Sequence, residues 1–497
     1  MAGLILATLL PAASCAQPHR PNVLFISVDD MRDWTGHLGG YEGAVVTPNI
    51  DRLAGLGVAF TNAHCASPLC GPSRLAIMSG RMPSSTGAYD NDQWWMPNLP
   101  SLATLPAYFR RQNYTVVGAG KTFHHTAGFN PPNQWDAYHP LLFRNDPWFR
   151  RNRLNYPWSE SGESPPGFPF SKVSGLGVEH DWGALPIAES AHDDAASVDY
   201  ALEFLARRHS KPFFLACGIF RPHLPWYVPQ RYLDLYPIEK IRLPPVLAGD
   251  LADLPEAGRA LAERKSEVLQ KIKAAGAWQA AVRAYLASIS FADAQVGRLL
   301  DGLLRSSHAR NTIIVLWSDH GFHLGEKDHW AKSTLWEVST RVPFVLVAPG
   351  VSATGKASSR PVSLVDVFPT LIDLCGLPKL AGLDGRSLTP LLRAPEAAWE
   401  WPAVIEFEPG NVAVRSDRYR YIRYRDGTEE LYDHARDPHE WRNLAADPDQ
   451  AGTIGELKKW LPRTWAPPLL PKSAFDFDPH SFTWTNKATG TVVSGKE

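Results

Sequence analysis

The sequence predicts an α/β protein with a large, mostly parallel sheet flanked by helices and a smaller C-terminal antiparallel α+β subdomain. Three observations predict this fold. The chain has 497 residues, which suits one large domain and an appendage. Along most of it, short β-branched or aromatic runs end in polar residues and lead into helical stretches, the pattern of βα units. From residue 396 to residue 497 the pattern changes to short alternating runs, such as VAVRSDRYRYIRY, with a closing helix.

Four apolar runs are the expected core strands of the large domain, residues 18–395. They cover residues 23–28, 115–118, 213–216 and 312–317, and the polar residues that follow them are Asp29-Asp30, Lys121, His223 and Asp319-His320. Open α/β sheets bind ligands outside the carboxyl ends of their strands. We therefore expect the chemistry of the protein to converge at those ends.

Two further segments of this domain have patterns of their own. Apolar residues recur at spacings of four and three from Tyr285 to Leu303, which is typical of a helix packed on a sheet. Residues 126–190 are rich in Pro, Gly, Ser, aromatic residues and arginine, including Trp135, Tyr138, Phe143, Arg144, Trp148, Phe149, Arg150, Arg151, Arg153, Tyr156 and Trp158. We expect an insertion that folds over the sheet, either a lid or binding loop or a surface excursion packed by its own aromatics.

Composition and charge exclude several classes of protein. With 44% hydrophobic and 20% charged residues the chain is globular rather than disordered. Its net charge of -1 predicts no general attraction to nucleic acid or to an anionic membrane, so an anion would be recognised by a local cluster of bases. The five cysteines, Cys15, Cys65, Cys70, Cys217 and Cys375, are too few for a disulfide framework in so long a chain.

The N-terminus resembles an export signal. Residues 3–14 form a short apolar run followed by small residues, which predicts a signal peptide over residues 1–16 with cleavage after Ala16. Cys15 offers an alternative, a lipid anchor, and an uncleaved apolar end of a mis-started chain is a third reading. No segment is long enough to span a membrane. The expected location is the periplasm or the extracellular space.

Three carboxylates and an imidazole indicate a metal site. Asp29-Asp30 taken alone could be a helix cap or a turn, but Asp319-His320 ends a second strand at the same edge of the sheet. Together they make an oxygen-rich site suited to Ca²⁺ or Mg²⁺, with an open position for a substrate oxygen. Because His320 would contribute a nitrogen ligand, the site is also compatible with a divalent ion other than Ca²⁺ or Mg²⁺.

Basic side chains form the second half of the expected site. Arg74, Lys121 and Lys332 could surround a tetrahedral oxyanion, and His124 and His223 could move protons near neutral pH. Each residue alone has a plainer explanation, a solvated lysine or a structural histidine. A metal with three fixed cations suits a sulfuryl or phosphoryl group, which needs charge neutralisation and in-line positioning.

Cys70 precedes a predicted helix over residues 72–78, with Pro72 in its first turn. A helix start and nearby cations lower the pKa of a thiol, so Cys-His hydrolysis by a thiolate is one reading. A thiolate is nevertheless a poor match for a hard metal, which takes oxygen ligands. Oxygen chemistry at position 70 fits better, and the residues alone leave both readings open.

The run Cys70-Gly71-Pro72-Ser73-Arg74 is followed after four residues by Ser79-Gly80-Arg81. This motif resembles the signature C-x-P-S-R…T/S-G-R of the type I formylglycine-dependent sulfatases of the alkaline phosphatase superfamily. Similar segments follow in the family's order: PNVLFISVDDMRD at 21–33, TPNIDRLAGLGVAFTNAH at 47–64, GKTFH at 120–124, RPHLPW at 221–226, SDHGFHLGEKDHWAKSTLWE at 318–337 and ELYDHARDPHEWRNL at 430–444. Lys121-x-x-His124 and Trp330-Ala331-Lys332 look most like the iduronate-2-sulfatase branch.

The resemblance implies a role for each site residue. A separate formylglycine-generating enzyme would oxidise Cys70 to 3-oxoalanine (formylglycine), whose hydrate binds the metal and attacks sulfur. Asp29, Asp30, Asp319 and His320 would hold Ca²⁺, with Mg²⁺ as the weaker alternative. Arg74 would support the hydrate, Lys121 and Lys332 would bind sulfate, His223 with Lys332 would protonate the leaving alcohol, and His124 would be the base that expels sulfate. Gly71 replaces the usual Ala, Ser or Thr and should not block modification, and Cys65 should be a buried small hydrophobe.

The expected activity is hydrolysis of sulfate esters on a sulfated carbohydrate, with a 2-O-sulfated uronate-like sugar as one substrate. Trp94 and Trp95, with the aromatic and arginine-rich insertion, are the candidate sugar contacts, because flat rings stack on sugars and guanidinium groups pair with carboxylate or sulfate. Two alternatives are a phosphate or phosphonate monoester hydrolase and a sulfated-glycan-binding protein without turnover.

Overall fold

The computed structural model describes residues 20–139 and 167–496, and its centre is an eight-stranded sheet of order β13-β2-β12-β9-β1-β7-β4-β5. Only β12 runs antiparallel to its neighbours in this sheet. The predicted α/β fold with a mostly parallel sheet is therefore confirmed. The strands are β1 (Asn22–Val28), β2 (Val58–Phe60), β4 (Thr115–Gly120), β5 (Ala137–His139), β7 (Phe213–Ile219), β9 (Thr312–Ser318), β12 (Phe344–Val347) and β13 (Lys356–Ser358).

The central strand β1 aligns the ends of its two neighbours. Every residue of β1, β7 and β9 is buried, as expected for parallel strands covered on both faces. Val28 at the end of β1 is opposite Ile219 of β7 and Ser318 of β9. The residues that follow these three strands therefore emerge side by side at one edge of the sheet.

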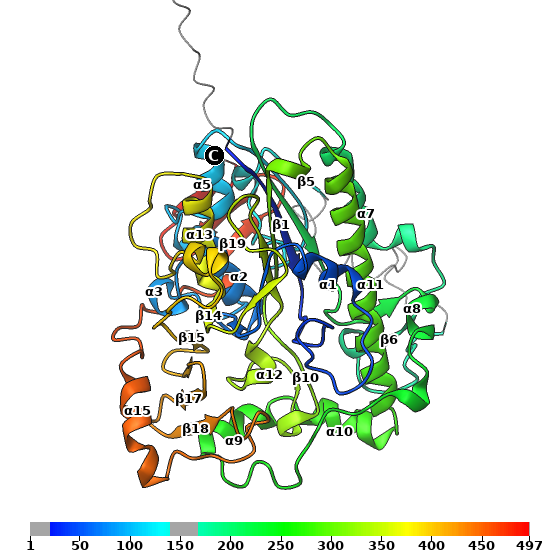
Figure 1. The fold of residues 1–497 in the computed structure, drawn as a ribbon, viewed down its shortest axis with the longest axis vertical. Helices are drawn as coiled ribbons and strands as arrows, with labels where there is room; N and C mark the ends of the chain where they lie inside the picture. The colour runs from blue at the N-terminus through cyan, green and yellow to red at the C-terminus, as the bar shows by residue number, and fades with distance from the viewer. Residues whose placement is uncertain (1–19, 140–166, 497) are drawn as a thin grey trace, which may run out of the picture.

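Helices cover both faces of the sheet (Figure 1). On one face lie α1 (Pro48–Ala54), α7 (Asp193–Leu205) and α11 (Trp278–Arg305), and α11 buries the predicted stripe from Tyr285 to Leu303 against Leu24 and Ile26. On the other face lie α2 (Cys70–Ser79), α5 (Leu105–Arg111) and α13 (Val367–Leu374), against Val23 and Phe25. The shorter helices are α3 (Pro83–Thr86), α4 (Trp95–Asn98), α8 (Gln230–Asp234), α9 (Glu256–Glu263), α10 (Ser266–Ala274), α12 (Glu337–Thr340) and α14 (Thr389–Arg393).

The segment predicted as an insertion, residues 126–190, is described only in part. Residues 140–166, which include Phe143, Trp148, Phe149, Tyr156, Trp158 and the four arginines, lie outside the described residues. β5 joins the edge of the main sheet beside β4, and Trp135 and Tyr138 are buried in the core. This first part is therefore sheet and core rather than a cover over the sheet. Further along, β6 (Trp182–Ala184) pairs with β8 (Trp226–Val228).

The C-terminal part begins with an antiparallel sheet, as the alternating pattern predicts. It consists of β15 (Ala403–Glu406), β16 (Val412–Arg415), β17 (Tyr419–Arg423) and β18 (Glu429–Asp433). One face joins the main core through residues such as Ile405 and Ile422. The predicted closing helix is α15 (Ala451–Lys458), which packs on the other face through Ile454 and Leu457.

A second small sheet follows and returns to the N-terminal half of the chain. It contains β19 (Phe475–Asp478), β20 (Thr483–Asn486) and β21 (Val492–Ser494). Phe477 and Trp484 pack on Trp94, with ring centroids 5.3 and 6.4 Å away. The remaining short strands pair as β3 (Ala63–His64) with β14 (Val362–Ser363) and β10 (His323–Leu324) with β11 (Trp330–Ala331).

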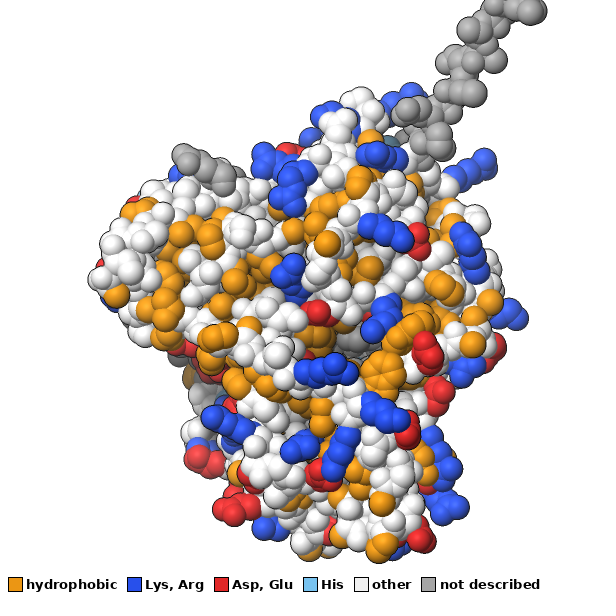
Figure 2. All heavy atoms as spheres, turned by 90° about the vertical axis from the view of Figure 1, so that its left-hand side faces the viewer, with side chains coloured by type: hydrophobic (Ala, Val, Ile, Leu, Met, Phe, Trp, Pro, Cys, Tyr) orange, Lys and Arg blue, Asp and Glu red, His pale blue; other side chains and the backbone are white. Residues whose placement is uncertain are grey.

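Three expectations about cysteines, membranes and charge can be compared with this fold. Cys65, Cys70, Cys217 and Cys375 are free and buried, and Cys65 has no exposed surface, as a small core residue should. The proposed signal segment 1–16 and Cys15 lie outside the described residues. In the described ranges, no helix is long and apolar enough to cross a membrane. On the face shown in Figure 2, Lys and Arg are interspersed with acidic, apolar and uncharged side chains.

A buried carboxyl group links the C-terminal sheet to the N-terminal half and makes stability depend on pH. Glu406 of β15 accepts hydrogen bonds from the backbone nitrogen and the hydroxyl of Ser84, at 2.6 and 2.7 Å. Burial raises the pKa of Glu406 from 4.5 to about 7. Its stabilising contribution is therefore complete below pH 4.5 and is lost as the pH rises through 7, where a buried carboxylate forms.

We expect Glu406→Gln to be more stable than the natural protein at pH 8 and nearly equal to it at pH 5. The upper limit of the gain in unfolding free energy is about 3 kcal/mol, because each pKa unit corresponds to roughly 1.4 kcal/mol. Urea unfolding at both pH values measures it. Glu400→Gln, at an exposed position, is the control and should show no such difference. A gain that is equal at both pH values would contradict the assignment.

Candidate functional site

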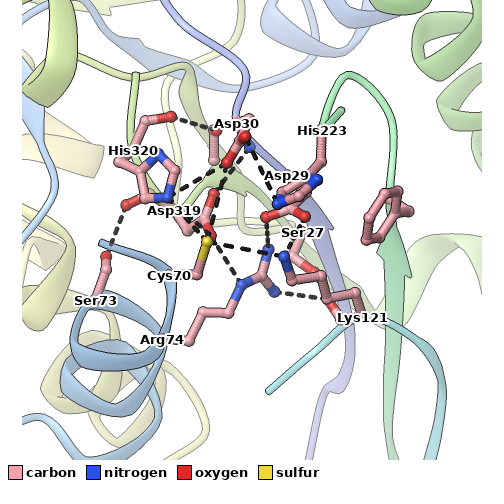
Figure 3. Close-up of polar contacts among 12 residues, drawn as sticks. Ser27, Asp29, Asp30, Cys70, Ser73, Arg74, Lys121, His223, Asp319 and His320 are labelled. Atoms are coloured by element: carbon pink, nitrogen blue, oxygen red, sulfur yellow. Dashed lines mark hydrogen bonds and ion pairs between the residues drawn. The ribbon is translucent and has the colours of Figure 1, made fainter. Parts of the chain in front are cut away.

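The carboxyl ends of β1 and β9 bring four predicted residues together (Figure 3). The backbone nitrogen of Asp30 donates to Asp319 Oδ1 at 3.0 Å, which ties the two strand ends together. Asp30 has a left-handed backbone (φ 57°), and the hydroxyl of Tyr285 donates to its carbonyl oxygen at 2.8 Å. All three carboxylates, Asp29, Asp30 and Asp319, are buried together with His320.

Cys70 is the first residue of α2 and points into this group of carboxylates. Its sulfur lies 3.2 Å from His320 Nε2 and 3.1 Å from the Lys332 ammonium. The helix itself is held by Ser73, whose hydroxyl donates to the Asp319 carbonyl oxygen at 2.7 Å. The structure thus places the predicted nucleophile, the predicted metal ligands and one predicted sulfate-binding lysine around one point.

Asn91 also positions Cys70, and sequence reasoning missed it. Its side-chain oxygen accepts a hydrogen bond from the backbone nitrogen of Gly71 at 2.7 Å. A Cβ atom at position 71 would lie only 2.6 Å from that oxygen, so the unusual glycine makes room for Asn91. The departure of Gly71 from the family pattern is the one signal in the sequence that could have pointed to this contact.

Arg74 joins two of the strand ends. Its guanidinium lies 2.9 Å from both Asp29 Oδ1 and Asp319 Oδ2, and one further nitrogen donates to the carbonyl oxygens of Lys121 and Thr122. The side chain has no exposed surface. Fully buried ion pairs of this geometry fix orientation, so Arg74 sets the positions of two carboxylates rather than facing solvent.

The two predicted lysines approach the carboxylates from different loops. Lys121, at the end of β4, pairs with Asp29, and Lys332, after β11, lies 2.7 Å from Asp30 Oδ1. Three cations therefore face three carboxylates around Cys70. A divalent cation and a bound anion would add opposite charges to this balanced group, so the site suits both.

The donor set fits a hard divalent cation. Donor atoms of Asp30, Cys70, Asp319 and His320 all lie within 4.8 Å of one another, and Asp29, Asp30 and His223 form an overlapping group. The Nδ1 atom of His320 lies 3.1 Å from the Gly321 carbonyl oxygen, which assigns it the proton and leaves Nε2 as a lone-pair donor toward Asp30. Carboxylate oxygens with one imidazole suit Ca²⁺ or Mg²⁺.

Burial and charge shift the acid strengths of these groups. Burial and the neighbouring Asp319 raise the pKa of Asp29. Burial would also raise the pKa of Asp319, but Arg74 and His320 hold it well below its ordinary value. With these protein groups alone, burial raises the pKa of the Cys70 thiol, which disfavours a thiolate nucleophile.

His124 is buried and His223 is partly buried near the site. Burial, with the charge of Lys121, lowers the pKa of each histidine well below its ordinary value. His223 Nδ1 lies 2.6 Å from the Leu224 carbonyl oxygen, so Nε2 faces Asp30 Oδ2 at 3.8 Å. His125, which sequence reasoning missed, lies between them, with ring centroids 4.7 and 5.6 Å from His124 and His223.

The prediction that Trp94 and Trp95 form a sugar-stacking surface is wrong. They are only 8% and 2% exposed, and their ring nitrogens donate to the carbonyl oxygens of Ala127 and Phe129. Trp95 stacks on Phe123 and Trp94 is covered by the second C-terminal sheet. Neither ring presents a face to a sugar, because other parts of the chain already occupy it.

Comparisons with known proteins agree with this geometry. The model of the family "Sulfatase" matches residues 21–377, and that of "N-sulphoglucosamine sulphohydrolase, C-terminal" matches residues 325–466. A sulfatase of Formosa agariphila is 40% identical over 487 residues, covering 96% of this chain and 92% of that protein. Human iduronate 2-sulfatase is 32% identical over 406 residues, covering 72% of this chain and 69% of that protein.

Solved structures show the same fold. The phosphonate monoester hydrolase of Agrobacterium radiobacter has a TM-score of 0.73 at 23% identity, and the likeness covers 96% of this chain and 99% of that one. At this identity the likeness concerns the fold alone. It shows that the sheet, its helices and the C-terminal part are arranged as in that solved structure.

Proposed function

This chain belongs to the sulfatase family and is a sulfuric ester hydrolase, and from that premise we propose that its substrate is a sulfated carbohydrate bearing a uronate-like sugar sulfated at the 2-position. The observation that supports this activity most strongly is that three cations, Arg74, Lys121 and Lys332, and three carboxylates surround Cys70. The substrate class is supported by human iduronate 2-sulfatase, which is 32% identical to this chain.

We propose that Asp29, Asp30, Asp319 and His320, together with residue 70, hold Ca²⁺, and that a separate formylglycine-generating enzyme converts Cys70 to formylglycine. The oxygen-rich donor set supports the choice of Ca²⁺, and the raised pKa of the buried Cys70 thiol supports modification over thiolate chemistry. When present, the cation neutralises sulfate charge and formylglycine supplies an oxygen nucleophile. Export from the cytoplasm, through residues 1–16 or with a lipid on Cys15, is part of the same proposal.

The remaining residues bind the sulfate group and move protons. Lys121 and Lys332 donate hydrogen bonds to sulfate oxygens, while Arg74 keeps Asp29 and Asp319 in place. Burial and the charges of Lys121 and Lys332 lower the pKa of His223, and a bound anion offsets the two lysine charges. Nε2 then takes up a proton from solvent and donates it to the leaving alcohol.

His124 can accept a proton, because its Nδ1 has no hydrogen-bond partner within the described parts of the chain. Its pKa is lowered by burial first and by Lys121 second, which keeps the ring neutral. We therefore assign His124 as the base that accepts the proton whose removal lets sulfate leave residue 70.

Release of inorganic sulfate tests this function. We expect the protein, co-expressed with a formylglycine-generating enzyme, to release sulfate from 2-O-sulfated uronate oligosaccharides and only slowly from matched phosphate and phosphonate esters. A chelator should remove the activity, and Ca²⁺ should restore it better than Mg²⁺. Activity confined to small aryl sulfates would contradict the carbohydrate substrate, faster hydrolysis of phosphonates would favour the rival enzyme, and saccharide binding without sulfate release would favour a binding protein.

A further inference from the structure

Lys472, from the C-terminal segment, lies beside His124 although it is far from the catalytic motifs in sequence. It begins a short turn of 3-10 helix, Lys472–Ala474, immediately before β19. Its ammonium lies 4.8 Å from the ring centroid of Phe129, and the ring of His124 lies 4.8 Å from the same phenyl ring. Lys472 and the histidine that we assign as the base thus both contact the ring of Phe129.

The backbone around Lys472 is held firmly in this place. Its own nitrogen donates to the Asp92 carbonyl oxygen at 2.7 Å. Just before it, Leu469 accepts a hydrogen bond from the Gln93 side chain at 2.7 Å, and the Leu470 nitrogen donates to Asn98 Oδ1 at 3.0 Å. These contacts connect Lys472 to the loop that carries Asn91, the residue that holds the start of α2.

The ammonium of Lys472 has little to balance its charge. In residues 20–139 and 167–496, no carboxylate oxygen forms an ion pair with it within 4.0 Å. It lies over the faces of Phe129 and Trp94, with a long contact of 3.4 Å to the Thr126 hydroxyl. Burial lowers the pKa of this half-buried lysine, although Asp92 and Asp90 raise it from a distance. A partly desolvated cation without an ion-pair partner attracts an anion.

This position differs from the sulfate site around Cys70. Lys121 and Lys332 both pair with carboxylates at the end of β1, Asp29 and Asp30. Among the described residues, the Lys472 ammonium contacts aromatic rings and a hydroxyl instead. The two family models end at residues 377 and 466, so neither includes it. Lys472 is therefore free to act on a part of the substrate that the shared catalytic residues do not touch.

We propose that Lys472 binds a second anionic group of the substrate, a uronate carboxylate or a neighbouring sulfate, and so makes the enzyme prefer sugars with two anions. The inference rests on the proposed sulfatase activity. Carboxylate and sulfate share the chemistry that an ammonium recognises, negatively charged oxygen atoms. Trp94 and the sheet β19–β21 then gain a role, because they hold Lys472 against the site.

The test uses Lys472→Met, which keeps the length and packing of the side chain, and Lys472→Arg, which keeps the charge. Three versions of one 2-O-sulfated disaccharide serve as substrates. The uronate and the carboxyl-reduced form with a second sulfate each have an anion besides the reacting sulfate and are called the charged forms. The carboxyl-reduced form without a second sulfate has none and is called the neutral form. We expect Lys472→Met to raise KM for a charged form by about tenfold or more, because the variant loses one hydrogen bond to a charged group. The kcat of Lys472→Met on the charged forms, and its kcat and KM on the neutral form, should change less than about twofold. Lys472→Arg should retain most of the preference for substrates with two anions.

The outcomes test the role of Lys472 separately from the sulfatase activity on which it rests. A larger loss on the uronate identifies the carboxylate as the partner, and a larger loss on the disulfated form identifies the sulfate. An equal loss on all three substrates means that Lys472 is only structural, and no loss on either charged form also overturns the proposal. If the natural protein cleaves none of them, the sulfatase substrate is wrong, and calorimetric binding of the same three saccharides to both proteins decides the role of Lys472.

Discussion

Replacing Cys70 with alanine is expected to abolish sulfate release, with a fall in kcat of about a million-fold, the size seen when a catalytic nucleophile is removed. Cys70 is the first residue of α2 and is surrounded by Lys332, His320 and the carboxylates. No other described cysteine can replace it, because Cys65, Cys217 and Cys375 are buried elsewhere in the core. The assay is release of inorganic sulfate from the best substrate of the panel.

Cys65→Ala is the matched control, since it also removes a buried thiol. The Cys65 thiol packs in the main core and donates a long hydrogen bond to the Ser339 carbonyl oxygen, at 3.9 Å. This variant should lose some stability and keep its kcat within about twofold, because it leaves a small cavity away from the reaction. Full activity of Cys70→Ala would contradict the role of residue 70.

The chemical state of residue 70 can be measured separately from its necessity. We expect mass spectrometry of the peptide that contains Cys70 to show formylglycine in active protein. A serine at this position would accept sulfate and keep it as a stable ester, so Cys70→Ser should become sulfated once and stop. An unmodified thiol in fully active protein would contradict the formylglycine mechanism while leaving the sulfatase activity intact.

Local signals were enough to predict the residues at the strand ends. Asp29 and Asp319 each follow a buried apolar run, and parallel strands place such positions at one edge of the sheet. Local patterns also predict two other parts of the fold. Proline and glycine mark the helix that starts at Cys70, and alternating residues mark the strands after residue 403. These parts of the fold and site follow from short stretches of sequence.

Long-range contacts explain what the sequence could not show. Nothing local distinguishes an exposed tryptophan pair from a buried one, and Trp94 is buried because β19 and β20, from the other end of the chain, pack on it. The same return of the chain places Lys472 near His124. Asn91 lies in a loop without periodicity, and its contact with Gly71 depends on how that loop packs against α2.

Arg74→Met is expected to lower the unfolding free energy of the chelator-treated protein by about 3–5 kcal/mol, the usual cost of removing one member of a buried ion pair. The variant leaves two buried carboxylates without their shared partner, and it takes one hydrogen-bond donor from each of two backbone carbonyl oxygens. This is a large fraction of the stability of a folded domain, roughly 5–15 kcal/mol. Urea unfolding in the presence of chelator gives the value.

The environment of Arg74, rather than its charge alone, should decide the size of this loss. Arg52 forms a comparable ion pair with Asp301 at 2.8 Å, but both side chains are more than 40% exposed. Arg52→Met should therefore cost less than about 1 kcal/mol, because water screens the pair. Arg74→Lys keeps a charge but cannot bridge Asp29 and Asp319 with a planar fork, so it should fall between the two variants. Equal losses for Arg74→Met and Arg52→Met would show that the buried pairs do not hold the strand ends together, and the geometry of the proposed metal ligands would then need another support.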